Sequence, residues 1–199
     1  IDEVLGRSEQ GITQPFLCRA TDGKRYYVKG QGAGYSSLVK ELIVGRLAKR
    51  FGLPVAPFEI LEMPRSFYNN LPNVELKDLG FGPVFGSKVC ENVSEMTTSD
   101  LKSADVKCME DILFFDWWVR NGDRTLTAFG GNPNLLWSAG DRCVTVIDFN
   151  LAFDDTVTRE SIVDEHIFRD FFDPVAYDEG KRTEYCHRFG QCLKAWDEI

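Results

Sequence analysis

Three oxygen-bearing side chains near the middle of the chain have the types and the order that phosphoryl transfer requires. Asp123 lies in a Gly-containing turn, Asn134 precedes an apolar run, and Asp148 closes a second apolar run. Phosphoryl transfer needs a carboxylate that orients the attacking hydroxyl, together with oxygen ligands that hold Mg²⁺ on the nucleotide phosphates. Mg²⁺ is commonly bound by one or two protein oxygens plus phosphates and water. We therefore predict that Asp123 orients the acceptor and that Asn134 and Asp148, joined by a hairpin, hold the metal.

Taken singly, each of the three residues has a structural explanation, because Asp and Asn commonly form turns. Taken together, they resemble the catalytic loop and metal-binding segment of the HipA-like kinases. These are bacterial relatives of the protein-kinase fold, and they share features with phosphatidylinositol-kinase-like enzymes. The resemblance is carried by Asn-Gly-Asp-Arg at 121–124, Asn-Pro-Asn-Leu-Leu at 132–136 and Val-Ile-Asp-Phe at 146–149. It implies that Asp123 is the catalytic base and that the two ligand residues hold Mg²⁺ on ATP.

The loop after the Asn-Gly-Asp-Arg turn departs from the family pattern. Seven residues, 125–131, separate Arg124 from Asn132, so the loop is longer than usual and either Asn132 or Asn134 could be the metal ligand. We assign Asn134 to the metal and Asn132 to the nucleotide site. Asn150 replaces the Gly that follows Asp-Phe in kinases, a change that the tolerance of Asn for left-handed backbone explains.

The N-terminal part has the pattern of a β-meander. Short apolar segments separated by turn residues predict strands between residues 3 and 30, of which 25–29 is the clearest. By the resemblance to kinases, the backbone from Ser8 to Gly11 is expected to cover ATP, and Lys29 is expected to reach its phosphates.

A helix is predicted over residues 36–51, where apolar residues recur at helical spacing. Glu41 lies one turn into it and could face Lys29, as in the ion pair by which kinases position this lysine. The alternatives are that Lys29 is a solvated strand end and that Glu41 is one more charge on an exposed helix face. The Gly-x-Gly at 30–32 suggests a dinucleotide-binding turn. Because Tyr35 replaces the third Gly and no run of βαβ units follows, we interpret this segment as a loop.

The later segments supply a hinge and a buried helix. Residues 84–89 are the predicted hinge, where the backbone around Phe85 and Ser87 would pair with the adenine edge. Residues 108–119 are apolar nearly all round, which predicts a buried helix that delivers the catalytic turn to the cleft. Asp116 within this helix is expected to be hydrogen-bonded for structural reasons.

These elements predict an α+β fold, a compact two-lobed protein-kinase-like arrangement in one catalytic domain. Residues 1–90 would form a β-rich N-lobe, and residues 91–199 a mainly helical C-lobe. Helices over residues 159–172 and 180–196 would close the core of the C-lobe.

Composition excludes some classes of partner. The 199 residues carry a net charge of −8 and are 43% hydrophobic, as in a folded globular protein. We expect neither nucleic acid nor an anionic membrane as a direct partner, because both favour basic surfaces.

The six cysteines have no metal-site spacing, so we expect reduced thiols in a cytoplasmic protein. No apolar run approaches the length of a membrane span.

The predicted activity is ATP- and Mg²⁺-dependent transfer of the γ-phosphoryl group to a hydroxyl, on a protein Ser or Thr if the resemblance extends that far. A small-molecule or lipid kinase is the nearest alternative, because related catalytic loops serve those acceptors. The alternative outside catalysis is a nucleotide-binding pseudokinase that acts as an interaction module. The joint presence of Asp123, Asn134 and Asp148 argues against it.

Overall fold

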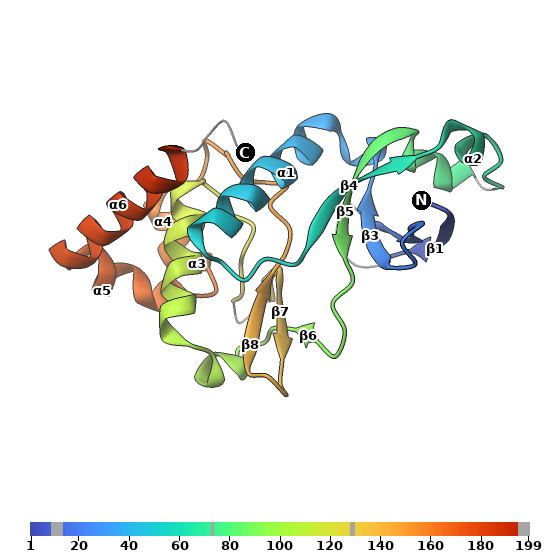
Figure 1. Cartoon of the computed structure of the whole chain (residues 1–199). Helices are drawn as coiled ribbons and strands as arrows, with labels where there is room; N and C mark the ends of the chain where they lie inside the picture. Colours follow the sequence, from blue (N-terminus) through green and yellow to red (C-terminus); the bar gives the residue numbers. More distant parts are fainter. Residues whose placement is uncertain (9–13, 73, 128–129, 195–199) are drawn as a thin grey trace. The chain divides into compact units, whose positions relative to one another are not determined.

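The computed structural model describes residues 1–8, 14–72, 74–127 and 130–194 (Figure 1). Its class is α+β, with a strand-rich N-terminal part and helices that predominate later. Within the described residues, no helix is long and apolar enough to cross a membrane. All six cysteines are free.

The chain forms two compact units, of which the first comprises residues 1–42 with 56–91 and the second residues 43–55 with 92–199. The division after residue 91 lies one position from the boundary predicted after residue 90. Residues 43–55, however, were expected in the first part and belong to the second unit. The helix α1 (Tyr35–Phe51) therefore contributes its first half to one unit and its second half to the other.

The first unit is built on a five-stranded antiparallel sheet. Its strands are β1 (Glu3–Arg7), β2 (Phe16–Arg19), β3 (Arg25–Lys29), β4 (Phe58–Met63) and β5 (Gly82–Lys88). They lie in the order β1-β2-β3-β5-β4. β3 shows the alternation of a strand with one covered face, since Tyr26 and Val28 are buried and Tyr27 is exposed. Asp22 stabilises the preceding turn, because its Oδ1 accepts a hydrogen bond from the backbone N–H of Lys24 at 2.9 Å.

The segment predicted as a hinge, residues 84–89, lies mostly within β5. This strand has a neighbour on each side, and Phe85 and Ser87 are paired with both. A central strand uses its backbone N–H and C=O groups in the sheet, so these two residues do not offer them to an adenine edge. Gly86 in this strand packs closely against β4, since a Cβ at that position would lie 2.5 Å from Cδ1 of Leu61.

Close packing also explains the Gly-x-Gly segment after β3. The segment forms the short 3-10 helix η1 (Gln31–Ala33). This helix contacts a second 3-10 helix, η2 (Val74–Leu79), which follows the short helix α2 (Arg65–Asn69). A Cβ at Gly30 would lie 2.1 Å from the carbonyl oxygen of Leu79. Only Gly permits that approach. This geometry agrees with the interpretation of the segment as a loop.

The second unit combines a three-stranded sheet with most of the helices. The sheet holds β6 (Ser94–Glu95), β7 (Leu135–Ser138) and β8 (Cys143–Val146), in that order and antiparallel. The helices are α3 (Val106–Trp118), α4 (Arg159–Glu165), α5 (Phe172–Ala176) and α6 (Glu179–Lys194), with the 3-10 helices η3 (Asp100–Ser103) and η4 (Arg169–Phe171).

Helix α3 is buried in the core of this unit, as its apolar sequence predicted. Its N-terminus is capped by Asp105, whose side chain accepts a hydrogen bond from the backbone N–H of Cys108 at 2.8 Å. Ile112 and Phe115 have no exposed surface, and full burial of such side chains contributes about 1.5–3 kcal/mol each. Asp116 on the same helix is also fully buried. A carboxylate in that position requires partners.

The helix predicted over residues 159–172 is interrupted at His166. Its backbone there is extended, with φ −61° and ψ 138°. The chain instead pairs with the Asn-Gly-Asp-Arg turn, and the backbone N–H of Ile167 donates to the carbonyl of Arg124 at 3.1 Å. The local spacing of apolar residues carries no information about pairing between residues so far apart in the sequence. Pro174 lies in the first turn of α5, where its missing N–H is not needed.

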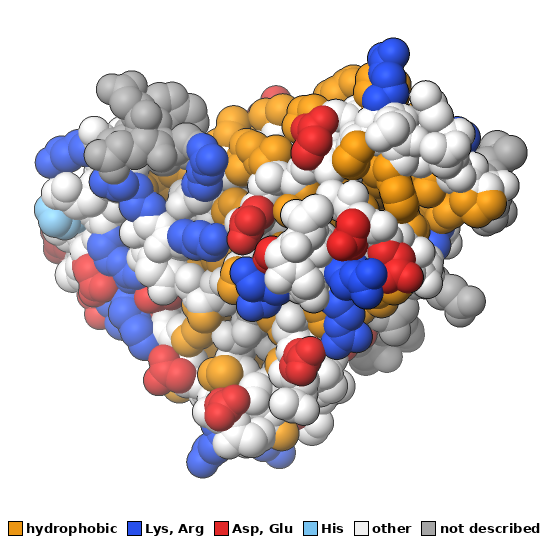
Figure 2. Space-filling model, turned by 45° about the vertical axis from the view of Figure 1, so that its right-hand side comes forward, with side chains coloured by type: hydrophobic (Ala, Val, Ile, Leu, Met, Phe, Trp, Pro, Cys, Tyr) orange, Lys and Arg blue, Asp and Glu red, His pale blue; other side chains and the backbone are white. Residues whose placement is uncertain are grey.

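Acidic and basic side chains are interspersed on the face of the molecule that Figure 2 presents. With a net charge of −8 for the chain, this face differs from the continuous basic surface that binds nucleic-acid phosphates.

Candidate active site

Strands β7 and β8 form the hairpin predicted to bring Asn134 and Asp148 together. Asn134 directly precedes β7, and Asp148 follows the last residue of β8 after one intervening residue. Leu135 lies opposite Val146 in the ladder, and beyond the strand ends the N–H of Ile147 donates to the carbonyl of Asn134 at 3.1 Å. The two predicted ligand residues therefore lie at the same end of the hairpin.

The side chain of Asn134 links this hairpin to the Asn-Gly-Asp-Arg turn. Its Nδ2 donates to Oδ2 of Asp123 at 2.8 Å, and the residue is only 6% exposed. An amide that donates through its nitrogen presents its oxygen as an acceptor, so Oδ1 is the atom suited to a cation. Asn132 instead closes the loop, since its carbonyl accepts from the N–H of Thr125 at 3.1 Å. The contact with Asp123 favours Asn134 over Asn132 as the metal ligand.

Both predicted ligand residues have left-handed backbone, with φ +49° at Asn134 and +58° at Asp148. Asn and Asp tolerate this region better than other non-Gly residues. The left-handed geometry anticipated for Asn150 is thus found at Asp148 instead. The N–H of Asn150 donates to Oδ1 of Asp148 at 3.3 Å, a local bond of the kind that stabilises Asp in turns. Backbone outliers of this kind concentrate at functional sites.

The donor set at this end of the hairpin fits Mg²⁺. The amide oxygen of Asn134 and the carboxylate of Asp148 are hard oxygen ligands. Over residues 1–8, 14–72, 74–127 and 130–194, no group of three or more His, Cys, Asp or Glu side chains is placed to hold a metal. A metal bound by these two residues would complete its coordination with phosphate and water, as Mg²⁺ usually does.

Arg124, the neighbour of Asp123, is the centre of a buried polar cluster. Arg124 and Asp116 have no exposed surface. Nε of Arg124 donates to Oδ2 of Asp116 at 2.6 Å, and Nη2 donates to Oδ1 at 3.4 Å. Its third nitrogen, Nη1, donates to the carbonyl of Asn134 at 2.7 Å and to that of Ile147 at 3.3 Å. Arg124 thus connects helix α3 to both sides of the hairpin.

Asp116 accepts two further hydrogen bonds. Nδ2 of Asn121 donates to Oδ1 at 2.9 Å, and Nε2 of His166 lies 3.2 Å from Oδ2. Because the N–H of Phe168 donates to Nδ1 of His166 at 3.0 Å, the ring proton is on Nε2 and the ring is neutral.

The pKa values of this cluster agree with that assignment. Burial lowers the pKa of His166, although the hydrogen bond to Asp116 opposes the change. Burial alone would raise the pKa of Asp116, but the charge of Arg124 and the hydrogen bond from His166 outweigh it and keep the pKa below its ordinary value. At neutral pH the cluster therefore holds one anion, one cation and a neutral imidazole.

Sequence reasoning identified Asp116 as a hydrogen-bonded residue but missed the parts played by Arg124 and His166. A lone acid in an apolar helix calls for a buried cation, and Arg124 is only eight positions away. That signal was available. His166 is fifty positions from Asp116, and no local pattern connects them.

The first unit contains the predicted ion pair between Lys29 and Glu41. Lys29 at the end of β3 is 8% exposed and Glu41 in α1 is 2% exposed, and Nζ of Lys29 bonds Oε1 of Glu41. This burial excludes both a solvated strand end and a wet helix face. Phe85 lies opposite Lys29 across β3 and β5.

The segment expected to cover ATP is described only in part. Ser8 follows β1, and its N–H donates to the carbonyl of Pro15 at 2.8 Å. Gly11 lies outside the described residues. Ser87 lies within β5, opposite Tyr27.

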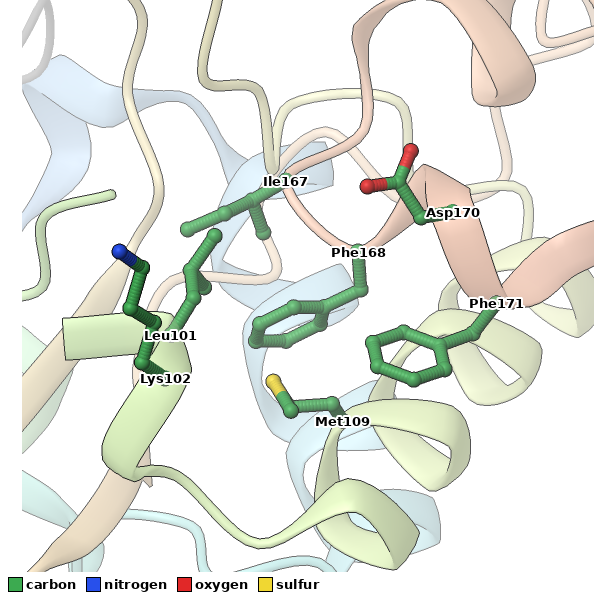
Figure 3. Close-up of a pocket in the computed structure, with 7 residues that line it drawn as sticks. All are labelled: Leu101, Lys102, Met109, Ile167, Phe168, Asp170 and Phe171. Carbon is green, nitrogen blue, oxygen red and sulfur yellow. The ribbon is translucent and has the colours of Figure 1, made fainter. Parts of the chain in front are cut away.

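A separate pocket of about 190 Å³ lies in the second unit. Its apolar lining residues are Leu101, Met109, Ile167, Phe168 and Phe171, and Figure 3 shows Lys102 and Asp170 on opposite sides of them. Small-molecule sites usually have volumes of roughly 300–1,000 Å³, so this pocket is too small for a nucleotide. None of the predicted site residues lines it.

The family model of the HipA-like kinases matches residues 1–199. A comparison with curated proteins gave no match. The family match includes the Lys29–Glu41 pair, Asp123 and the buried cluster around Arg124.

Proposed function

The chain belongs to the HipA-like kinase family, and from this premise we propose that it is an ATP- and Mg²⁺-dependent phosphotransferase acting on a protein Ser or Thr. Membership of the family implies a kinase-type transfer, which in general uses ATP and a divalent metal. The observation that carries the proposal is the hydrogen bond from Asn134 to Asp123. It joins the predicted base to a predicted metal ligand within one unit.

In this proposal Asp123 orients the acceptor hydroxyl and takes its proton. The hydroxyl oxygen forms a bond to the γ-phosphorus while the bond from that phosphorus to the bridging oxygen of ADP breaks. Asn134 holds Asp123 through Nδ2, and its Oδ1 and the carboxylate of Asp148 would hold the metal. When bound, Mg²⁺ neutralises charge on the phosphates.

Lys29 would bind the nucleotide phosphates. An ammonium group carries three donors, so one nitrogen can bond Glu41 and phosphate oxygens together. The burial of Glu41 supports this role, because a fixed carboxylate holds the ammonium at the end of β3.

Incubation with γ-labelled ATP and Mg²⁺, alone and with cell lysate, tests the reaction and its acceptor. Label in the protein itself or in a lysate protein is the expected result. Label confined to small molecules or lipid would replace the protein acceptor with one of those classes. ATP binding without any transfer would identify a pseudokinase.

Replacement of Asp123 tests the site. Asp123→Asn keeps the size of the side chain but cannot accept the hydroxyl proton, so transfer should fall about 10²- to 10⁴-fold. The affinity for Mg·ATP should change by less than about threefold, since the carboxylate faces the acceptor. Asp155→Asn is the matched control, because the Asp155 side chain is 95% exposed. A folded Asp123→Asn protein with transfer near wild type would reject Asp123 as the base.

A further inference from the structure

The guanidinium of Arg124 lies between the two backbone segments that carry the predicted metal ligands. Nη1 donates to the carbonyl of Asn134 itself at 2.7 Å and to that of Ile147, the residue before Asp148, at 3.3 Å. We propose that Arg124 is a positioning residue that fixes the separation of Asn134 and Asp148 for a divalent cation. The inference rests on the proposed function, because it concerns the same metal site.

Arg124 acts only through the residues that it holds. It has no exposed surface, so it does not contact nucleotide or acceptor. Its planar fork directs Nε and Nη2 at the carboxylate of Asp116 and Nη1 at the hairpin carbonyls. A lysine has a single nitrogen and cannot reproduce these directions.

The charge of Arg124 is neutralised where it lies. An uncompensated cation beside a metal site would repel Mg²⁺. Asp116 pairs with the guanidinium at 2.6 Å, and His166 is neutral. The cluster therefore holds the metal-ligand segments without adding net positive charge next to them.

The backbone conformations of Asn134 and Asp148 show why these two residues need the hydrogen bonds from Arg124. Both adopt positive φ, +49° at Asn134 and +58° at Asp148. Such conformations persist only where the surrounding structure determines them. The hydrogen bonds from Arg124 fall on Asn134 itself and on the peptide group that joins Ile147 to Asp148.

The test compares Arg124→Lys with Arg120→Lys. Arg120 is a matched control because its side chain is about half exposed and pairs with the exposed Asp155 at 2.6 Å. Calorimetry measures the affinity for a non-hydrolysable ATP analogue as Mg²⁺ is titrated. In Arg124→Lys, the Mg²⁺ concentration that gives half of the maximal increase in affinity for the analogue should rise about tenfold or more. Loss of other residues that orient metal ligands has an effect of this size. Affinity without Mg²⁺ should be unchanged, and Arg120→Lys should match wild type.

A second variant separates positioning from folding. Asp116→Asn combined with Arg124→Met removes both buried charges together, so that neither is left unpaired in the core. The folded double variant should show the same rise in Mg²⁺ requirement. A wild-type Mg²⁺ requirement in either folded variant overturns the proposal. In the unaltered protein, NMR should show slower exchange of the Arg124 Nη1 protons, which bond the hairpin carbonyls, when Mg²⁺ is added to the nucleotide complex, and unchanged exchange would also overturn the proposal.

The proposed function and this inference fail in different ways. If wild-type protein binds the nucleotide analogue with no dependence on Mg²⁺, both fail. If wild type depends on Mg²⁺ and the folded Arg124 variants share that dependence, only the positioning role fails.

Discussion

Each of the two units contains a buried ion pair, and the two pairs differ in what they leave available to a ligand. Lys29 and Glu41 in the first unit retain 8% and 2% exposure, whereas Arg124 and Asp116 in the second have none. A lysine ammonium is compact and can turn among partners, but a guanidinium is fixed by its planar fork. The first pair is suited to direct contact with phosphate, and the second to holding other residues in place.

The comparison also shows that a shifted pKa does not by itself identify the reacting groups. Perturbed pKa values are a common guide to active sites. Here the pKa values of Asp116 and His166 are both lowered, yet neither side chain has more than a trace of exposed surface. Both side chains belong to the buried cluster around Arg124, and their burial keeps them from contact with a ligand.

The largest expected effect comes from removing one member of the fully buried pair. Asp116→Ala leaves the charge of Arg124 buried without a counter-ion, so the free energy of unfolding should fall by about 3–5 kcal/mol. Urea denaturation measures this loss. Asp155→Ala, which breaks the exposed pair with Arg120, should leave the midpoint nearly unchanged. A loss below about 1 kcal/mol for Asp116→Ala would mean that the buried pair is no stronger than a surface pair.

Removal of Lys29 from the first pair should mainly reduce activity and should leave the fold of the second unit unchanged. Lys29→Ala should lower kcat/KM by about 10²-fold, the typical cost of one electrostatic donor to the reacting group. Glu41→Ala should give a milder form of the same defect. Because Glu41 acts through Lys29, the double variant should be non-additive, and strict additivity would separate their roles. Lys24→Ala, in the exposed turn before β3, is the control.

The smallest expected effect is a pH dependence of stability that originates in His166. Burial lowers its pKa, so below about pH 6.5 the unfolded chain takes up a proton that the folded chain does not. Stability should therefore decrease as pH falls from about 6.5 towards the folded-state pKa, by at most about 1.4 kcal/mol per pH unit. His166→Gln should flatten this slope in denaturation experiments, and replacement of the exposed His187 should not. Equal slopes in wild type and His166→Gln would contradict this origin.

Asp116 should add a second pH dependence in more acidic solution. Because its pKa is lowered in the folded protein, its contribution is present above the ordinary value of about 3.9 and is lost as pH falls through the folded-state pKa.

Local patterns predicted those parts of the fold that local forces determine. The bounds of β3 agree with the prediction for residues 25–29, and α3 was expected from an apolar stretch over 108–119. The same patterns failed at β5 and at His166. At β5 the residues predicted to form a hinge are paired with a neighbouring strand on each side. At His166 the chain leaves its helix to pair with residues far away in the sequence.

The candidate site was predictable to the extent that its chemistry lies in consecutive motifs. The order of Asp123, Asn134 and Asp148 predicted a hairpin, and the hairpin places Asn134 in contact with Asp123. The pairing of Arg124 with Asp116 was predictable, but its contacts with the hairpin were not, because the acceptors there are backbone carbonyls. Carbonyl groups are the same in every residue, so sequence carries no record of which ones an arginine will bind.

The positive φ angles of Asn134 and Asp148 have an evolutionary consequence. Glycine occupies this region without steric cost. A change of either residue to Gly would therefore remove a proposed metal ligand and relax the backbone at the same time. For Asp148 one base change in the codon suffices. Under the proposed function, an inactive protein would therefore lie a single substitution from the enzyme, and selection for activity would be needed to retain Asp148.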